Sequence, residues 1–153
     1  MNKNEIIFTL EELPKVAREL ADRLKDCKIL TFEGPLGAGK TTLIKQLLSL
    51  YGVNENVVSP TFTYMNIYYK ANNGKTFYHF DLYRISKVED FLAAGFDEYL
   101  IDPYGVCFIE WPEVIEPIIR LKTQVCRLTL DYHKDENTRV IRFELTPPQP
   151  TST

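Results

Sequence analysis

Gly34-Pro35-Leu36-Gly37-Ala38-Gly39-Lys40-Thr41 decides the fold of this chain, because it matches the phosphate-binding pattern G-x-x-x-x-G-K-[ST]. The apolar run Lys28–Glu33 precedes it and has the composition of a short strand. Lys40–Tyr51 then follows a helical pattern that ends at Gly52. A strand, a glycine-rich loop and a helix in this order predict a P-loop, whereas a simple glycine-rich turn with an exposed lysine would need no such flanks.

Each residue type in the loop suits the binding of a nucleotide polyphosphate. Glycines allow successive backbone N–H groups to point inward around phosphate oxygens, and the helix N-terminus adds partial positive charge. Lys40 is expected to neutralise the terminal phosphates, and the Thr41 hydroxyl is expected to ligate Mg²⁺. The expected nucleotide contacts in this segment are Gly34, Gly37, Ala38, Gly39, Lys40, Thr41 and Thr42.

Two acids at strand ends are candidates to complete the site. Asp81 ends the apolar run Phe77–Phe80, and Glu110 ends the run Val106–Ile109. Open α/β sheets bind ligands at the carboxyl ends of their strands, and phosphoryl transfer needs a metal and a group that positions the attacking oxygen. We expect both acids to be catalytic and to hold Mg²⁺, directly or through water. Taken alone, either acid could be a solvated strand end or a helix cap.

Two further features flank these acids. Pro60 forces Ser59 into an extended conformation, so the segment Ser59–Thr63 presents hydroxyls on a loop, where Thr61 could sense the γ-phosphate. An ordinary start of a strand would explain the same residues. Trp111, the only tryptophan, follows Glu110 and is a candidate to cover the nucleotide, although a lone tryptophan is more often part of a core.

The rest of the chain alternates helical and strand patterns. Pro14 lies where the first turn of a helix over Glu11–Lys25 is expected. Other expected elements are a hairpin of strands Phe62–Tyr69 and Thr76–Phe80, short helices Lys87–Ala94 and Phe96–Leu100, a strand Val106–Ile109, and strands Gln124–Asp131 and Arg139–Leu145 joined by a polar turn His133–Thr138. This order predicts a single-domain α/β P-loop NTPase over residues 1–146, with a mixed, mainly parallel central sheet flanked by helices. Residues 147–153 are expected to form a flexible tail.

Composition limits the function classes. With 153 residues, 44% hydrophobic and 25% charged, the chain is expected to be one soluble domain. A formal charge of −3 disfavours autonomous nucleic-acid binding. No apolar run approaches the roughly 20 residues that span a bilayer, and no signal peptide is evident, so a cytoplasmic protein is expected. Cys27, Cys107 and Cys126 are expected to be reduced and buried, and His79 and His133 are expected to be structural.

Four motifs in order together resemble the TsaE (formerly YjeE) family of bacterial P-loop ATPases: GPLGAGKTTL from Gly34, SPTFTY from Ser59, HFDLYR from His79 and FIEWPE from Phe108. The resemblance spans roughly Leu10 to Leu145. It implies an ATPase required for threonylcarbamoyladenosine modification of tRNA. Such a protein would act with a TsaD–TsaB complex, through which tRNA would be reached.

The resemblance also implies roles for single residues. Lys40 and Thr41 match the family's phosphate and Mg²⁺ contacts, and Thr61 lies in its switch-like segment. Asp81 matches its essential acid. Glu110 and Trp111 match its acid–tryptophan pair, although Pro112 stands where a small or polar residue is expected.

The expected mechanism is slow hydrolysis of ATP with Mg²⁺, coupled to a change in Ser59–Thr63 that alters contact with a partner complex. No in-cis arginine finger is assignable, so a partner is expected to supply or order missing groups. A small-molecule kinase is the rival enzyme, but it should carry an arginine-rich lid that the sequence lacks. A binding module regulated by nucleotide occupancy is the alternative from another class.

Overall fold

The computed structural model describes residues 4–60, 63–69 and 74–146. Along the chain the strands are β1 (Glu5–Thr9), β2 (Ile29–Glu33), β3 (Met65–Tyr69), β4 (Thr76–Asp81), β5 (Gly105–Glu110), β6 (Val125–His133) and β7 (Asp135–Thr146). The α-helices are α1 (Leu13–Arg23), α2 (Lys40–Leu50), α3 (Val88–Ala93), α4 (Asp97–Leu100) and α5 (Glu116–Ile119), and the 3₁₀ turns are η1 (Leu10–Glu12) and η2 (Pro112–Ile115).

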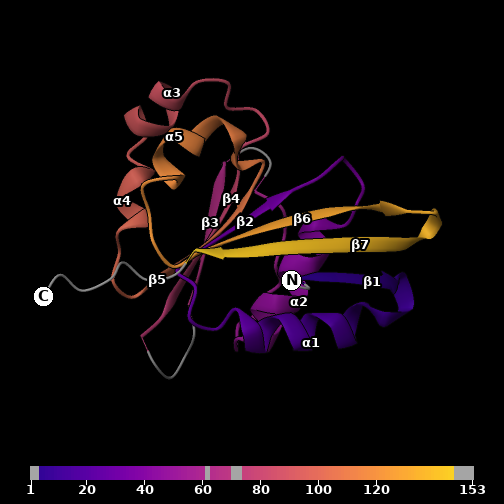
Figure 1. Ribbon diagram of the computed structural model, residues 1–153. Helices are drawn as coiled ribbons and strands as arrows, with labels where there is room; N and C mark the ends of the chain where they lie inside the picture. Colours follow the sequence, from indigo (N-terminus) through magenta and orange to yellow (C-terminus); the bar gives the residue numbers. More distant parts are fainter. Residues whose placement is uncertain (1–3, 61–62, 70–73, 147–153) are drawn as a thin grey trace, which may run out of the picture.

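All these strands form one mixed sheet in the order β1-β7-β6-β2-β5-β4-β3 (Figure 1). The central strands β6, β2, β5 and β4 are parallel, and the pairs β1–β7, β7–β6 and β4–β3 are antiparallel. The expected α/β fold with a mixed sheet is therefore confirmed, and its parallel part is the centre. The expected hairpin of β3 and β4 is confirmed as well.

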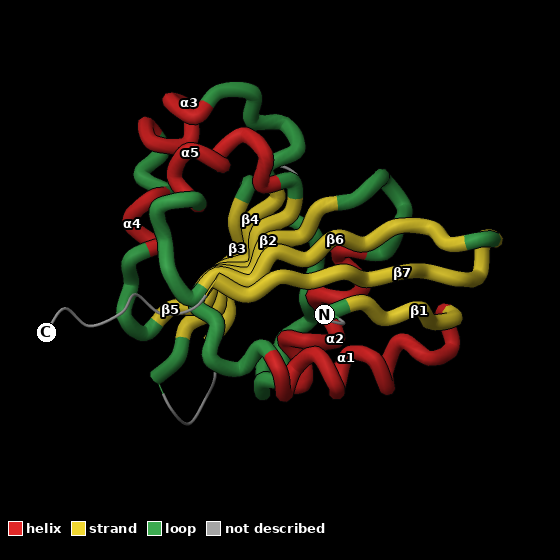
Figure 2. Tube along the Cα trace, viewed as in Figure 1, coloured by secondary structure: helices red, strands yellow, loops and turns green. Residues whose placement is uncertain are grey.

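Helices cover both faces of the sheet. α1 and α2 lie on one face, and α3, α4 and α5 lie on the other (Figure 2). The first face packs the larger core, in which Leu20, Leu43 and Phe108 are fully buried. The second core lies under the shorter helices and includes Phe80 and Ile109. Because strand side chains alternate, each central strand contributes residues to both cores.

Several element boundaries follow the sequence closely. Pro14 lies at the start of α1, where its missing N–H costs no helical hydrogen bond. α2 begins at Lys40 and ends one residue before Tyr51. The three cysteines are free and buried, as expected.

Other expectations were incomplete or wrong. β1, η2 and α5 were not predicted, and the polar turn over His133–Thr138 was too long, because only Lys134 separates β6 from β7. The polar residues here extend a hydrogen-bonded ladder beyond the core, so their polarity marks exposure and not a loop. The predicted flexible tail, residues 147–153, lies outside the described residues, as does Thr61.

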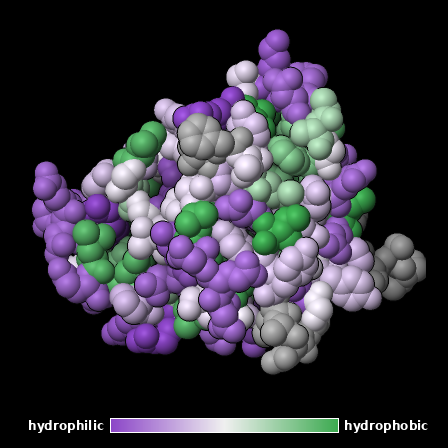
Figure 3. Space-filling view, turned by 180° about the vertical axis from the view of Figure 1, so that it is seen from behind, coloured by the Kyte–Doolittle hydropathy of each residue, from purple (hydrophilic) through white to green (hydrophobic). Residues whose placement is uncertain are grey.

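The face drawn in the space-filling view is mostly hydrophilic, with hydrophobic residues in small groups (Figure 3). Within the described ranges, no helix combines the length and the apolar character needed to cross a bilayer.

Candidate functional site

The predicted P-loop connects β2 to α2 and lies at the carboxyl ends of the parallel strands. A hollow of about 330 Å³ opens beside it. It is lined by Leu36, Gly37, Gly39, Lys40, Thr41, Thr42, Ser59, Asp81, Glu110 and Trp111. The structure thus brings together most residues that the sequence singled out, although Gly34 and Ala38 do not line the hollow.

Glycines allow the loop to take its course. Gly34 has φ +144°, and a Cβ atom placed on it would lie 2.0 Å from the backbone oxygen of Leu130. Gly39 has φ +108° and is the residue from which α2 starts. Both positions have a left-handed backbone, which favours glycine, and at Gly34 the Leu130 backbone also leaves no room for a Cβ atom.

Lys40 reaches back over its own loop. Its Nζ donates to the backbone oxygen of Gly34 and, at 3.4 Å, to that of Pro35. The same atom lies 3.6 Å from the centre of the Trp111 ring, which is a cation–π contact. Burial lowers the pKa of the Lys40 ammonium, and the nearby Glu110 carboxylate opposes that shift.

Glu110 is the buried acid of the site, at 3% exposure. Its Oε1 accepts a hydrogen bond of 2.8 Å from the Thr41 hydroxyl, across 69 residues of sequence. Its Oε2 lies 2.7 Å from Nε2 of His79. A carboxylate at the end of β5 is therefore joined to the first turn of α2, at the residue predicted to ligate Mg²⁺.

Asp81 is the more exposed acid and ends the neighbouring strand β4. Its Oδ2 accepts a hydrogen bond of 3.2 Å from the Ser59 hydroxyl, and its Oδ1 accepts one of 3.0 Å from the Tyr83 amide. The loop that follows α2 thus contacts Asp81 through Ser59.

Trp111 lines the hollow and does not belong to either core. Its backbone is left-handed, with φ 56°, and its ring contacts Tyr83 at 4.8 Å between centroids. Pro112 begins the 3₁₀ turn η2 directly after it, a position that proline tolerates. The departure from the expected motif therefore fits the local backbone.

The β6–β7 hairpin supports the P-loop from the other side. The buried Arg139 donates through Nε to the Ala38 backbone oxygen at 3.1 Å, and its guanidinium lies 4.2 Å from the centre of the Tyr132 ring. The Tyr132 hydroxyl donates to the Leu36 backbone oxygen at 3.5 Å. No motif in the sequence indicates these contacts, because they depend on the register of a hairpin whose Arg139 lies 101 residues after Ala38.

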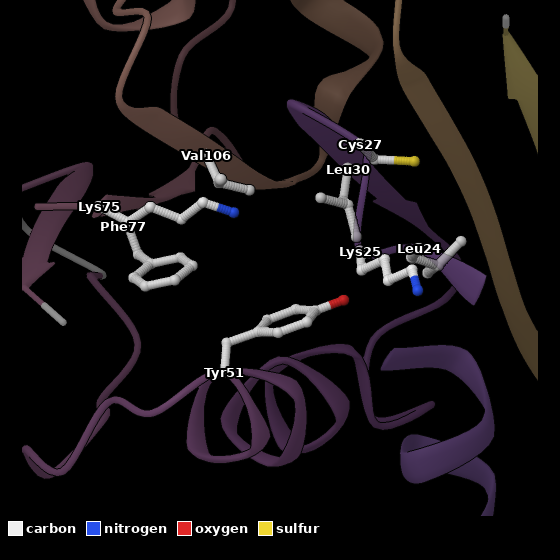
Figure 4. A pocket seen from close by; sticks show the side chains of 8 residues that line it. All are labelled: Leu24, Lys25, Cys27, Leu30, Tyr51, Lys75, Phe77 and Val106. Carbon is white, nitrogen blue, oxygen red and sulfur yellow. The ribbon is translucent and has the colours of Figure 1, made fainter. Parts of the chain in front are cut away.

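A second cavity of about 210 Å³ lies at the opposite, amino ends of β2, β4 and β5. Leu30, Phe77 and Val106 form its apolar part, and the side chains of Lys25, Tyr51 and Lys75 surround it (Figure 4). Its lining includes no carboxylate in the described part of the chain. The acids and the P-loop therefore identify the first hollow as the candidate site.

Comparisons with known proteins agree with one another. The family model described as "Threonylcarbamoyl adenosine biosynthesis protein TsaE" matches residues 7–141. The tRNA threonylcarbamoyladenosine biosynthesis protein TsaE of Rickettsia felis is 36% identical over 88% of this chain and 75% of its own length. The protein of the same name from Bacillus subtilis is 41% identical over 69% of this chain and 64% of its own length. The crystal structure of Bacillus subtilis YdiB superposes with a TM-score of 0.62 at 30% identity, over 94% of this chain and 86% of that one.

Proposed function

Since the chain belongs to the TsaE family of threonylcarbamoyl adenosine biosynthesis proteins, we propose that it binds ATP with Mg²⁺ and hydrolyses the ATP to support threonylcarbamoyladenosine modification of tRNA. The observation that carries the proposal is the hydrogen bond from Thr41 to Glu110, which joins the P-loop helix to a buried carboxylate. We further propose that the protein acts in the cytoplasm with a TsaD–TsaB complex, through which it reaches tRNA.

The P-loop would hold the polyphosphate. Backbone N–H groups around Gly37 and at the start of α2 carry partial positive charge, and Lys40 adds a full one. In the described conformation the Lys40 ammonium is engaged by loop carbonyls and by Trp111. Binding of a polyphosphate would therefore exchange these contacts for contacts with phosphate oxygens.

The donor set beside the loop fits Mg²⁺. The Thr41 hydroxyl and the carboxylates of Glu110 and Asp81 are hard oxygen ligands, which Mg²⁺ prefers. When bound, Mg²⁺ would supply charge stabilisation for the transferred phosphoryl group. Glu110 would orient the Thr41 hydroxyl toward the metal, because it already accepts that hydroxyl's hydrogen bond.

Asp81 would orient the attacking water together with the loop that contains Ser59. The hydrogen bond between Ser59 and Asp81 connects that loop to the end of β4, so a change at the γ-phosphate would be transmitted to the loop. No arginine lines the hollow within the described segments. We therefore propose slow turnover by the isolated chain and faster turnover when a partner supplies or orders missing groups.

The test measures release of inorganic phosphate from ATP and Mg²⁺, with and without the TsaD–TsaB complex and tRNA. We expect slow release by the chain alone and a partner-dependent increase. Glu110→Gln should lower the rate by about 100-fold or more, since it removes the negative charge that would organise the metal. Glu98→Gln is the matched control, because Glu98 is exposed on α4 and outside the hollow.

Three outcomes would contradict the proposal. Steady hydrolysis by the isolated chain at tens per second would remove the need for a partner. Transfer of the γ-phosphate to a small molecule in place of its release would identify a kinase. Normal tRNA modification by Asp81→Ala and Glu110→Ala variants that bind ATP without hydrolysing it would identify a module regulated by occupancy.

A further inference from the structure

We infer that His79 is a positioning residue of the ATP site, which fixes the Glu110 carboxylate so that Glu110 can orient Thr41 toward Mg²⁺. This inference rests on the proposed function. It assigns a role to a histidine that was expected from the sequence to be structural.

The contact between the two side chains is short and buried. His79 is 0% exposed and Glu110 is 3% exposed. The 2.7 Å distance joins Nε2 of His79 to Oε2 of Glu110. A carboxylate only accepts hydrogen bonds, so Nε2 carries the proton and donates it.

Sheet geometry gives this contact its place. His79 lies on β4 two residues before Asp81, so both side chains are on the face of the sheet that packs against α2. Its partner across the parallel pair is Phe108 of β5, two residues before Glu110. Phe77 precedes His79 on the same face, and Phe77 and Phe108 are buried in the larger core. The imidazole thus lies on the same buried face as these aromatic residues and has its polar contact at the site end.

The other ring nitrogen indicates that His79 does not serve stability alone. Nδ1 has no hydrogen-bond partner among the described residues, although the whole side chain is buried. A buried acceptor without a partner costs folding free energy, and an apolar side chain of similar size would avoid that cost. The hydrogen bond to Glu110 is therefore the interaction that a histidine makes at this position and an apolar residue would not.

The consequence concerns the plane of the Glu110 carboxylate. Thr41 donates to one of its oxygens and His79 donates to the other. Rotation of the carboxylate would break both hydrogen bonds, so the two donors together fix one orientation. Without His79, only the hydrogen bond from Thr41 would hold the Glu110 carboxylate. The carboxylate could then rotate together with the Thr41 hydroxyl that it is meant to orient. Partners of this kind around metal-ligating groups set metal affinity.

The experiment compares full-length His79→Leu and His79→Gln. We expect the Mg²⁺ concentration for half-maximal ATP hydrolysis to rise about 10-fold or more in His79→Leu. His79→Gln should recover most of this loss, because its amide retains a donor. Affinity for ATP in the presence of EDTA should stay unchanged in both variants, since the P-loop contacts are intact. Binding of Mn²⁺ to the ATP complex, followed by electron paramagnetic resonance, should weaken in parallel without any need for turnover.

Thr31→Val is the matched control. Thr31 is also fully buried in the sheet with an unpartnered side-chain oxygen among the described residues, but it lies on β2 beside Ile109, on the opposite face. We expect its Mg²⁺ requirement to equal that of the wild type. If His79→Leu does not fold, His79→Phe replaces it, because it keeps a planar aromatic ring without a hydrogen-bond donor.

Each result is decisive for one of the two proposals. An unchanged Mg²⁺ requirement in the apolar His79 variant would overturn the positioning role, as would a failure of His79→Gln to restore it. Equal losses of Mg²⁺ affinity and of Mg²⁺-free ATP affinity would indicate a merely structural role and also overturn it. Absence of hydrolysis in the wild type would instead refute the proposed function, and the Mn²⁺ measurement would still test His79.

Discussion

At the scale of single residues, backbone conformation sets the shape of the phosphate-binding loop. Gly34 turns the chain at the end of β2 with φ +144°, where its Cα faces the backbone of Leu130 on β6. The carbonyl of Gly34 also accepts a hydrogen bond from Lys40. Gly34 therefore lies close against the neighbouring strand and also accepts the hydrogen bond of Lys40.

Gly34→Ala should lower the free energy of unfolding by at least about 3 kcal/mol, because the added methyl combines left-handed strain with a clash against a backbone oxygen. Gly95→Ala is the control, since Gly95 also has positive φ, +77°, but no atom lies within 4 Å of the added Cβ. It should cost about 1 kcal/mol, from strain alone. Urea denaturation of both variants checks the difference, and equal losses would show that Leu130 does not constrain the loop.

At the scale of elements, a hydrogen bond between side chains joins the connection between α4 and β5 to strand β4. The Tyr78 hydroxyl donates a hydrogen bond of 2.6 Å to Oδ2 of Asp102, whose Oδ1 accepts from the Tyr104 amide at 2.9 Å. These bonds lower the pKa of Asp102, with the Tyr78 contact as the larger cause. Burial and the nearby carboxylate raise the pKa of Tyr78. The contact is therefore most favourable with a charged Asp102 and a neutral Tyr78.

Tyr78→Phe should lower the free energy of unfolding by about 1 kcal/mol at neutral pH. The folded pKa of Asp102 lies below its unfolded value of about 3.9, so this stabilisation is complete above that pH and is lost as pH falls through the folded pKa. The wild type and Tyr78→Phe should therefore converge in strong acid. Chemical denaturation from pH 7 to pH 2 measures the difference, and Asp102→Asn should remove the same pH dependence. A constant gap across that range would contradict the assignment.

The elements also show what the sequence could predict. Periodicity located α1 and α2, and strand composition located β2, β4 and β5, because apolar spacing records which side of an element is buried. β1 was missed because Glu5–Thr9 is a short edge strand whose pairing with β7 is set by residues far along the chain. η2 and α5 were missed because Pro112 and Pro117 interrupt any helical pattern.

At the scale of the whole molecule, the site exists because parallel strands end together. β2 carries the P-loop, β5 ends in Glu110 and β4 ends in Asp81, so three separate segments meet at one edge of the sheet. The two acids could be predicted from the sequence, since an acid after an apolar strand marks that edge. The contributions of His79 and Arg139 could not, because they follow from strand register and from a hairpin that packs behind the loop. Thr61, also predicted for the site, lies outside the described residues.

The position of Trp111 gives the protein a built-in optical reporter. It is the only tryptophan in the chain, and the Lys40 ammonium lies against its indole. All indole fluorescence therefore originates at the mouth of the P-loop. A polyphosphate that attracts the ammonium should change the emission intensity in proportion to occupancy, and Lys40→Ala should abolish that response. Nucleotide affinity could thus be measured from the intrinsic fluorescence of the unlabelled protein. An emission that does not change at saturating ATP and Mg²⁺ would show that the Lys40 ammonium keeps its contact with Trp111.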